Sequence, residues 1–345
     1  MIPFRTKAAV TIVGFLLFLS CQKEAADINP VTIKVNVFFI STYAGSPLQG
    51  NQDGPALQAS FKSPFGIAAT SEGAFFLTDN ANGNIRRISA EGLVETVTPL
   101  GSLNAPSGIE VGPTGVLYVC ESLNNRIVKV TSEGLISELD VYEVNTDGTH
   151  VKAHFNSPNG IALAPDGSIY IADTFNHKIR KISPKGQVAL VAGGPAGYKD
   201  GKCTEARFNL PFGITLDKDG SLYVADYGNH SIRKINADGI VSTVAGTDVE
   251  GNEDAVNGSD ARFRFPTDLA IAEDGTIYIA DYYNSRIRSI LTTGEVTTIA
   301  GTDDGFLDGV GITAKLFNPV ALAIYKKILY ITDSKNGRIR KIPLE

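Results

Sequence analysis

Short apolar runs alternate with turn residues along most of the chain, and the same alternation returns six times. In the copy that begins at Pro211, the apolar runs are GITL, SLYVA, SIRKI and IVSTVA, separated by short stretches of Asp, Asn and Gly. Runs of this length, rich in Ile, Val, Leu and Tyr, predict β-strands. The Asp-Gly pairs between them predict tight hairpins, because Gly adopts a positive φ without strain. No run is long enough for a helix, so each copy predicts a four-stranded antiparallel meander.

The spacing of the copies predicts how these meanders are arranged. The copies start 42, 52, 53, 55 and 53 residues apart, at Pro64, Pro106, Pro158, Pro211, Pro266 and Pro319. Repeats of this size form arrays of one structural unit, and four-stranded sheets repeated radially form a β-propeller. The segment 40–45 matches the last strand of a copy, while the sixth copy stops after its third strand. We therefore predict an all-β, six-bladed β-propeller of four-stranded antiparallel blades, closed by an N-terminal strand that completes the last blade.

The repeated text resembles the NHL repeat family, named for an Asn-His-Leu stretch. The Asn-His part stands here as Asn176-His177 and Asn229-His230, and the resemblance covers about residues 32–345. It implies the same six-bladed fold. The other four copies replace the His by other residues, which indicates that no chemistry requires it: Gly83, Asn125, Ser285 and Gly337.

The first 31 residues precede the repeats and divide into two parts. Arg5 and Lys7 precede an apolar run that ends in Ser20-Cys21, which is the order of a secretory signal and is too short to span a bilayer. Residues 1–21 resemble a bacterial lipoprotein signal, which implies lipidation of Cys21 and anchoring at the cell envelope, at the outer membrane or cell surface. A cleaved signal with an incidental Cys is the alternative. Residues 22–31 are polar and predict a tether to a propeller of residues 32–345.

Charge excludes one class of partner. Of the 31 Lys and Arg, two lie in the signal, which leaves 29 against 37 Asp and Glu. A nucleic-acid-binding face needs a basic surface for phosphate contacts, so we expect no nucleic-acid partner. Cys120 takes a strand position that is Ala in three other copies, and Cys203 lies two blades away. We expect no disulfide between them.

A carboxylate recurs at one position of every copy, which raises the question of a site. Five copies pair an Asp with an Arg on the third strand, whereas the second copy has Glu121 and Val128. The joint loss indicates an Asp–Arg or Asp–turn bond that fixes each blade's corner. A feature needed by every blade is a scaffold feature first.

Departures from the repeat are better candidates for a ligand site. Asp268 takes a position that is Gly in four copies, at the predicted mouth of the central channel. The residue after each Pro faces the same mouth, and the turns between the second and third strands lie further out. Aromatic and polar groups around a central depression are typical of ligand sites. The predicted ligand-binding residues are Asp268, Phe65, Asn159 and Phe212 at the mouth, with Phe175, Tyr227, Tyr282 and Tyr283 on the turns.

These observations favour a binding module for a protein or glycan, without catalytic residues, cofactor or metal. The alternative is a metal-dependent hydrolase or lyase that resembles lactonase or strictosidine-synthase-like propellers. It would hold a divalent metal in the central channel and would need carboxylate or amide neighbours of Asp268, such as Asn159. A structural envelope protein is a third possibility. His150 and His154 are interpreted as solvated residues of the loop 141–157, not as metal ligands.

Overall fold

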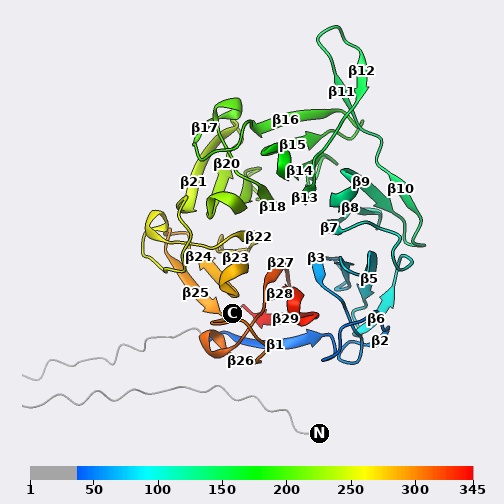
Figure 1. Ribbon diagram of the computed structural model, residues 1–345, viewed down its shortest axis with the longest axis vertical. Helices are drawn as coiled ribbons and strands as arrows, with labels where there is room; N and C mark the ends of the chain where they lie inside the picture. The colour runs from blue at the N-terminus through cyan, green and yellow to red at the C-terminus, as the bar shows by residue number, and fades with distance from the viewer. Residues whose placement is uncertain (1–36, 345) are drawn as a thin grey trace, which may run out of the picture. The chain divides into compact units, whose positions relative to one another are not determined.

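Six small sheets stand side by side in a ring in the computed structural model, which describes residues 37–344 (Figure 1). The predicted signal 1–21 with Cys21, the tether 22–31 and residues 32–36 lie outside the described residues. The all-β six-bladed propeller is confirmed. In the part of the chain that the structure describes, no helix has the length and apolar character needed to cross a membrane.

Each blade contributes its first strand to the centre of the ring and its later strands to the rim (Figure 1). Blade 1 comprises β3 (Pro64–Ala69), β4 (Phe75–Asp79), β5 (Asn84–Ile88) and β6 (Leu93–Thr96). Blade 2 comprises β7 (Pro106–Val111), β8 (Leu117–Glu121), β9 (Arg126–Val130) and β10 (Ile136–Glu138). Blade 3 comprises β13 (Pro158–Leu163), β14 (Ile169–Asp173), β15 (Lys178–Ile182) and β16 (Val188–Gly193). Blade 4 comprises β18 (Pro211–Leu216), β19 (Leu222–Asp226), β20 (Ser231–Ile235) and β21 (Ile240–Gly246).

The last two blades bring the ends of the described chain together. Blade 5 comprises β22 (Pro266–Ile271), β23 (Ile277–Asp281), β24 (Arg286–Ile290) and β25 (Val296–Ala300). Blade 6 comprises β27 (Pro319–Tyr325), β28 (Ile328–Asp333), β29 (Arg338–Pro343) and β1 (Phe39–Ala44). β1 pairs antiparallel with β29, with Ser41 opposite Lys341 and Thr42 opposite Arg340. The first described strand of the chain thus lies in the same sheet as its last three.

Three blades have a fifth strand, so the prediction of uniformly four-stranded blades was too simple. The extra strands are two residues long, lie on the outer edge and come from the link that precedes the blade: β2 (Gly54–Pro55), β17 (Gly201–Lys202) and β26 (Gly309–Val310). In blades 3 and 5 the preceding link makes a single bridge to the outer strand, Tyr142 to Gln187 and Ala255 to Val296. Covering an outer strand in this way satisfies backbone groups that would otherwise be free to pair with another chain.

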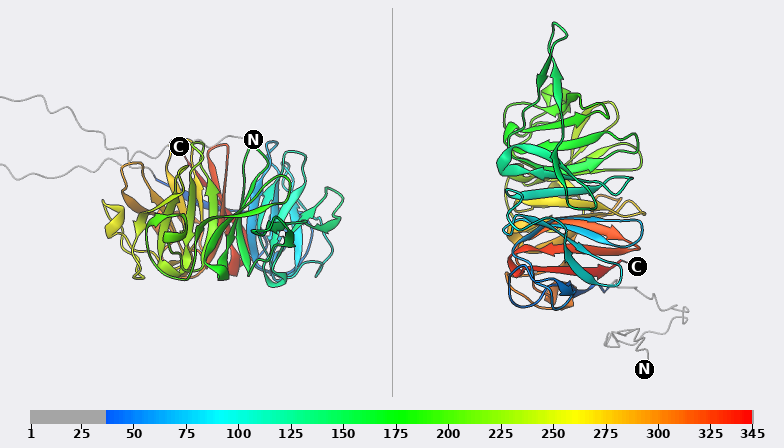
Figure 2. Two further views of the ribbon diagram at one scale, coloured as in Figure 1. Left: turned by 90° about the horizontal axis from the view of Figure 1, so that it is seen from above. Right: turned by 90° about the vertical axis from the view of Figure 1, so that its right-hand side faces the viewer.

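The link between blades 2 and 3 is not a plain loop. β11 (Tyr142–Val144) and β12 (His150–Lys152) form a separate two-stranded hairpin that projects from the ring (Figure 1 and Figure 2). The interpretation of His150 as a loop residue was therefore wrong: His150 lies in β12, and its ring stacks on that of Tyr142 with the centroids 4.3 Å apart. His154, which follows the hairpin, is exposed.

Short 3-10 turns join the second and third strands of five blades and also interrupt the links. They span η1 (Ser122–Asn124), η2 (Thr174–Asn176), η4 (Tyr227–Asn229), η6 (Tyr282–Asn284) and η8 (Ser334–Asn336) at the turns, and η3 (Cys203–Glu205), η5 (Gly258–Asp260) and η7 (Gly311–Thr313) in the links. The residue after each of the five turns is left-handed, with φ of 51–61°.

The His of the repeat occupies this left-handed position, and its role is structural. In blade 4 the Nδ1 atom of His230 accepts a hydrogen bond of 3.2 Å from the backbone N–H of Phe265, the residue before the next blade's Pro. Phe265 itself has a φ of 55°, which is strained for a residue with a Cβ. Asn125 and Ser285 accept the equivalent bond in their own blades. Asn and Ser thus supply the same acceptor as the His in blades 2 and 5, while blades 1 and 6 have Gly83 and Gly337 at this position.

This geometry predicts how substitutions of His230 affect stability. His230→Ala is expected to lower the free energy of unfolding by about 1 kcal/mol, because the N–H of Phe265 loses its partner. His230→Asn is expected to lose less than half of that, because blade 2 already uses Asn at this position. Urea unfolding of both variants measures the difference. Equal losses in the two variants would show that ring packing, not the acceptor atom, is what His230 contributes.

Candidate functional site

The recurrent carboxylate of each blade belongs to a buried ionic network, which we call the arginine clasp. In blade 4, Arg233 bonds to Asp226 of the same blade and to Asp200 of the preceding link, each with an N–O distance of 2.6 Å. The side chains of Arg233 and Asp226 are fully buried, while that of Asp200 is half-exposed. Asp226 also accepts hydrogen bonds from the backbone N–H of Asn209 and the side chain of Asn229. The clasp thus ties two strands, a turn and a link together.

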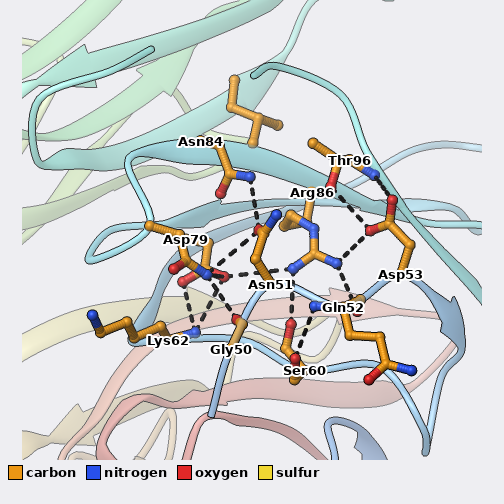
Figure 3. A network of polar contacts seen from close by, with 12 residues as sticks. Gly50, Asn51, Gln52, Asp53, Ser60, Lys62, Asp79, Asn84, Arg86 and Thr96 are labelled. Carbon is orange, nitrogen blue, oxygen red and sulfur yellow. Dashed lines mark hydrogen bonds and ion pairs between the residues drawn. The ribbon is translucent and has the colours of Figure 1, made fainter. Parts of the chain in front are cut away.

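Figure 3 shows the same arrangement in blade 1, where Arg86 lies between Asp79 and Asp53. Asp53 also accepts hydrogen bonds from the backbone and side chain of Thr96 on the outer strand. The clasp recurs in three further blades, formed by Arg180, Asp173 and Glu143, by Arg288, Asp281 and Asp254, and by Arg340, Asp333 and Asp308. The Asp–Arg bond expected from the sequence is present, and its role is that of scaffold.

The structure of blade 2 accounts for the replacement of both the Asp and the Arg of the clasp, by Glu121 and Val128. Its outer strand β10 has no covering strand or bridge among the described residues, so no link carboxylate is in place to meet an Arg. Val128 occupies the position of the Arg and is fully buried. Glu121 turns to Arg126, at 2.6 Å, and keeps the bonds to the link and the turn through Asn104 and Asn124.

The central channel is a cavity of about 270 Å³ bounded by the inner strands of all six blades. Glycine lets those strands approach one another. A Cβ on Gly66, Gly108 or Gly160 would lie 2.2–2.3 Å from a backbone oxygen of the next blade, far inside van der Waals contact. Glycine at these positions therefore permits the close approach of neighbouring inner strands.

Asp268 lies on the channel wall, and the structure changes how it is interpreted. It pairs in register with Ala280 of β23, a pairing that the equivalent residues of the other blades lack, and its Oδ2 accepts a hydrogen bond of 2.9 Å from the backbone N–H of Leu322 in blade 6. Asp268 thus contacts the backbone of the neighbouring blade 6. Asp268 is also not the lone carboxylate of the channel, because Glu110 of β7 lines the same cavity.

Three other predicted ligand residues line the same channel: Phe65, Phe212 and Asn159. Phe65 and Phe212 come from blades 1 and 4, and their ring centroids lie 5.9 Å apart. Asn159 lines the cavity and is only 8% exposed. Asp268 thus has one carboxylate and one amide in the same cavity, which is what the metal-dependent alternative required. Within residues 37–344, however, no group of three or more His, Cys, Asp or Glu side chains is placed to hold a metal ion.

Burial affects both channel carboxyls. It raises the pKa of Asp268 to about 7, against the hydrogen bonds from the backbone of Leu322 and Leu269. It also raises the pKa of Glu110 to about 7, and the negative charge of Asp268 adds to this effect. No Lys, Arg or His lies among the residues that line the cavity, so nothing there neutralises the pair.

An Asp268→Asn variant is expected to change how stability depends on pH. The pKa of Asp268 is raised on folding from its ordinary value near 4, so the folded state holds a proton that the unfolded state has lost between about pH 4 and 7. The stabilisation from this group is present below about pH 4 and is lost as the pH rises towards 7. The difference in free energy of unfolding between variant and parent should therefore shift in favour of the variant by roughly 1–3 kcal/mol when the pH is raised from about 4 to about 8.

Urea unfolding at the two pH values measures this, with Asp303→Asn, an exposed carboxylate, as the control. Asn can still accept the hydrogen bond from Leu322. An equal effect of Asp268→Asn at both pH values would contradict a titrating, unneutralised Asp268.

A continuous row of aromatic rings, which we call the aromatic row, runs from the channel to the turn η6, on the face that carries the turns between second and third strands and that we call the loop-bearing face. Phe65 contacts Phe212, which contacts Tyr227 at 5.5 Å between centroids, and Tyr227 contacts Phe265 at 4.8 Å. The row continues from Phe265 through Tyr283, at 5.3 Å, to Tyr282, at 4.7 Å. Five of the six predicted aromatic ligand residues thus fall in one row, together with Phe265, which the sequence-based prediction missed.

Phe175 is the exception among the predicted aromatics. Its side chain is 55% exposed, and it makes no ring contact with the aromatic row in the described chain. Tyr283, at 47% exposed, is the most open ring of the row, and the others are partly buried. Burial, together with the neighbouring Tyr283 and Tyr282, raises the pKa of Tyr227 to about 12. Its hydroxyl therefore stays a neutral hydrogen-bond donor at physiological pH.

Comparison with known protein families matches three parts of the chain. Residues 48–193 match the virginiamycin B lyase family, residues 196–252 the teneurin NHL domain and residues 263–288 the NHL repeat. NHL repeat-containing protein 2 of Bos taurus is 31% identical over 234 residues, which cover 57% of this chain and 32% of that protein. The match therefore spans about a third of the length of this relative.

Solved structures with the same architecture serve different purposes. An auxiliary nutrient binding protein from Bacteroides ovatus superposes with a TM-score of 0.70 at 19% identity, over 88% of this chain and 76% of that one. A gluconolactonase from Xanthomonas campestris superposes with a TM-score of 0.62 at 15% identity, over 89% of each chain. At these identities the likeness establishes the fold alone. Together with the six sheets, it shows a six-bladed β-propeller, and the sequence of the chain matches the NHL repeat and NHL domain models within residues 196–288.

Proposed function

We propose that this chain is a ligand-binding module of the bacterial cell envelope, anchored through a lipid on Cys21, which binds a protein or glycan on its loop-bearing face. The aromatic row carries the proposal. Scaffold contacts do not account for it, because its rings come from three blades and partly face solvent at Tyr283.

A glycan fits this surface better than a protein does. Sugar rings pack flat against aromatic faces, and partly buried rings with a hydroxyl, such as Tyr227, provide both apolar contact and hydrogen bonding. Standard protein interfaces bury about 800 Å² on each partner, which is more than a single row of rings supplies. The fold shared with auxiliary nutrient binding proteins supports a binding role.

The first test is a glycan array probed with the full chain, followed by titration calorimetry with the best glycan. Tyr227→Ala, in the middle of the row, is expected to weaken binding by at least about tenfold, which corresponds to about 1.4 kcal/mol. Phe175→Ala is the matched control, because Phe175 lies on the equivalent turn of blade 3 outside the row, and it should leave binding unchanged. Binding that depends on Phe175 and not on Tyr227 would contradict the site. A protein pulled down through Tyr227, with no glycan bound, would assign the site to a protein ligand instead.

The anchoring part of the proposal has its own test. A Cys21→Ala substitution should move the chain from the membrane fraction to the soluble fraction of the host, because a thiol is needed for lipid attachment. A chain that stays in the membrane fraction after this substitution would refute the lipid anchor and leave the glycan site untouched.

A further inference from the structure

The channel wall offers hydrogen-bond acceptors and no cation to match them. Glu110, Asn159 and Asp268 come from blades 2, 3 and 5 and line the same cavity. Of the remaining lining residues, only Thr215 and Thr267 are polar, and most are Ile, Leu, Ala and Gly. At the position of Glu110, the other five blades have Ala or Thr. The blade therefore does not require a carboxylate there.

The hydrogen bonds of these three groups leave acceptors free. Both N–H groups of Asn159 are used, by the carbonyl of Ser157 and the hydroxyl of Thr174, while its Oδ1 accepts no bond from the described residues. Asp268 accepts from the backbone of Leu322 and Leu269, and Glu110 from its neighbour Val111. A carboxylate has about four lone-pair sites, so both carboxylates and the amide retain acceptors.

An apolar cavity with two carboxylates is costly unless a cation is present. Charged groups out of water are stabilised by an opposite charge or else take up a proton, and burial raises the pKa of both carboxyls in the direction of proton uptake. A bound cation would restore both carboxylates to the ionised form. Phe65 and Phe212, which also line the cavity, would add the attraction of a cation to an aromatic face.

We propose that the channel binds a small protonated aliphatic amine. An ammonium group has three N–H donors and no acceptor, which complements an acceptor set made of Glu110, Asn159 and Asp268. The alkyl part would contact the Ile and Leu side chains of the inner strands. A calcium ion prefers six to eight oxygen ligands, and magnesium retains several waters. A wall that is mostly aliphatic suits neither ion as well.

This inference goes beyond the proposed function, because the amine site lies in the channel and the glycan site on the face. Variants separate the two. Glu110→Gln and Asp268→Asn should weaken amine binding and preserve glycan binding, while Tyr227→Ala should weaken glycan binding and preserve amine binding.

The experiment is titration calorimetry of the full chain at about pH 8 with n-butylamine and 1,4-diaminobutane, beside calcium and tetramethylammonium. Saturable binding of at least one primary amine with a Kd below ~10 mM, weakened at least about tenfold in Glu110→Gln and in Asp268→Asn, is the expected result. Both substitutions are near-isosteric and remove a partly buried charge, so neither should reduce stability in the absence of ligand. Thermal unfolding without ligand checks this.

Three outcomes would overturn the proposal. Absence of saturable amine binding up to ~10 mM would mean that protons alone neutralise the carboxyls. Calcium binding that excludes the amines would assign the channel to a metal and favour the hydrolase or lyase alternative. Equal binding of tetramethylammonium, which has no N–H donor, would show that the acceptor set of Glu110, Asn159 and Asp268 does not select the ligand.

Discussion

Asp226→Ala is expected to lower the free energy of unfolding by about 3–5 kcal/mol, the range for removal of one partner of a buried ion pair. The substitution leaves the fully buried guanidinium of Arg233 with only the half-exposed Asp200 as counter-ion. It also removes the acceptor of the backbone N–H of Asn209 and of Asn229. Burial raises the pKa of Asp226 to about 6, so urea unfolding at about pH 8 compares the variant with an ionised parent.

Glu95→Ala is the matched control, because Glu95 pairs with Arg87 at 2.9 Å while both side chains are 40–50% exposed. Exposed pairs contribute about 0–1 kcal/mol, so this loss should be small. An Asp226→Ala effect no larger than that of Glu95→Ala would mean that the clasp is not what secures the corner of the blade.

Gly160→Ala is expected to cost about 3 kcal/mol, at the upper end of the usual range for overpacking. The added Cβ would lie 2.2 Å from the carbonyl oxygen of Phe212 and 2.9 Å from the backbone nitrogen of Ile214. These are backbone atoms of the next blade's inner strand and cannot rotate away. The contact is relieved only if two blades separate near the axis. The expected loss appears as a lower midpoint in urea unfolding, and as weaker amine binding in the channel.

Gly309→Ala serves as the control for backbone conformation, since Gly309 is also in a strand and a Cβ there would meet only the hydroxyl of Thr313 at 3.5 Å. This variant should stay within about 0.5 kcal/mol of the parent. If both glycine substitutions cost the same, the close approach of the inner strands would not explain the glycines of the channel.

The fold was predictable from the sequence because each blade repeats the same local instructions. Strand length, turn glycines and the number of copies are all local or periodic features of the sequence. Tertiary packing did not override these local preferences. The extra edge strands were not predictable, because two-residue strands such as β2 and β17 have no pattern of their own. The hairpin at Tyr142–Lys152 was read as a loop, since no equivalent exists in the other copies.

The candidate site was predicted in part for similar reasons. Comparison of the six copies identified Asp268 as a departure, and the same comparison two positions further along the strands could have found Glu110 among Ala and Thr. The partners of the clasp were harder to predict. Asp200 and Arg233 are 33 residues apart, and the similar Asp-Gly pair at Asp147 lies instead in the hairpin turn, where it bonds to Thr149. Only the fold shows that Glu143 takes its place.

A closed ring of blades should open at the blade with the fewest stabilising contacts. That blade need not be the one in which the first and last described strands, β1 and β29, pair. Blade 6 joins β1 to β29, yet it carries a full clasp around Arg340 and an edge strand. Blade 2 has neither, and its outer strand is three residues long. Local unfolding starts in segments with few such restraints, so backbone amides of blade 2 should exchange with solvent deuterium ahead of those in blade 6. The blade expected to open first thus lies two blades away from the blade in which β1 pairs with β29.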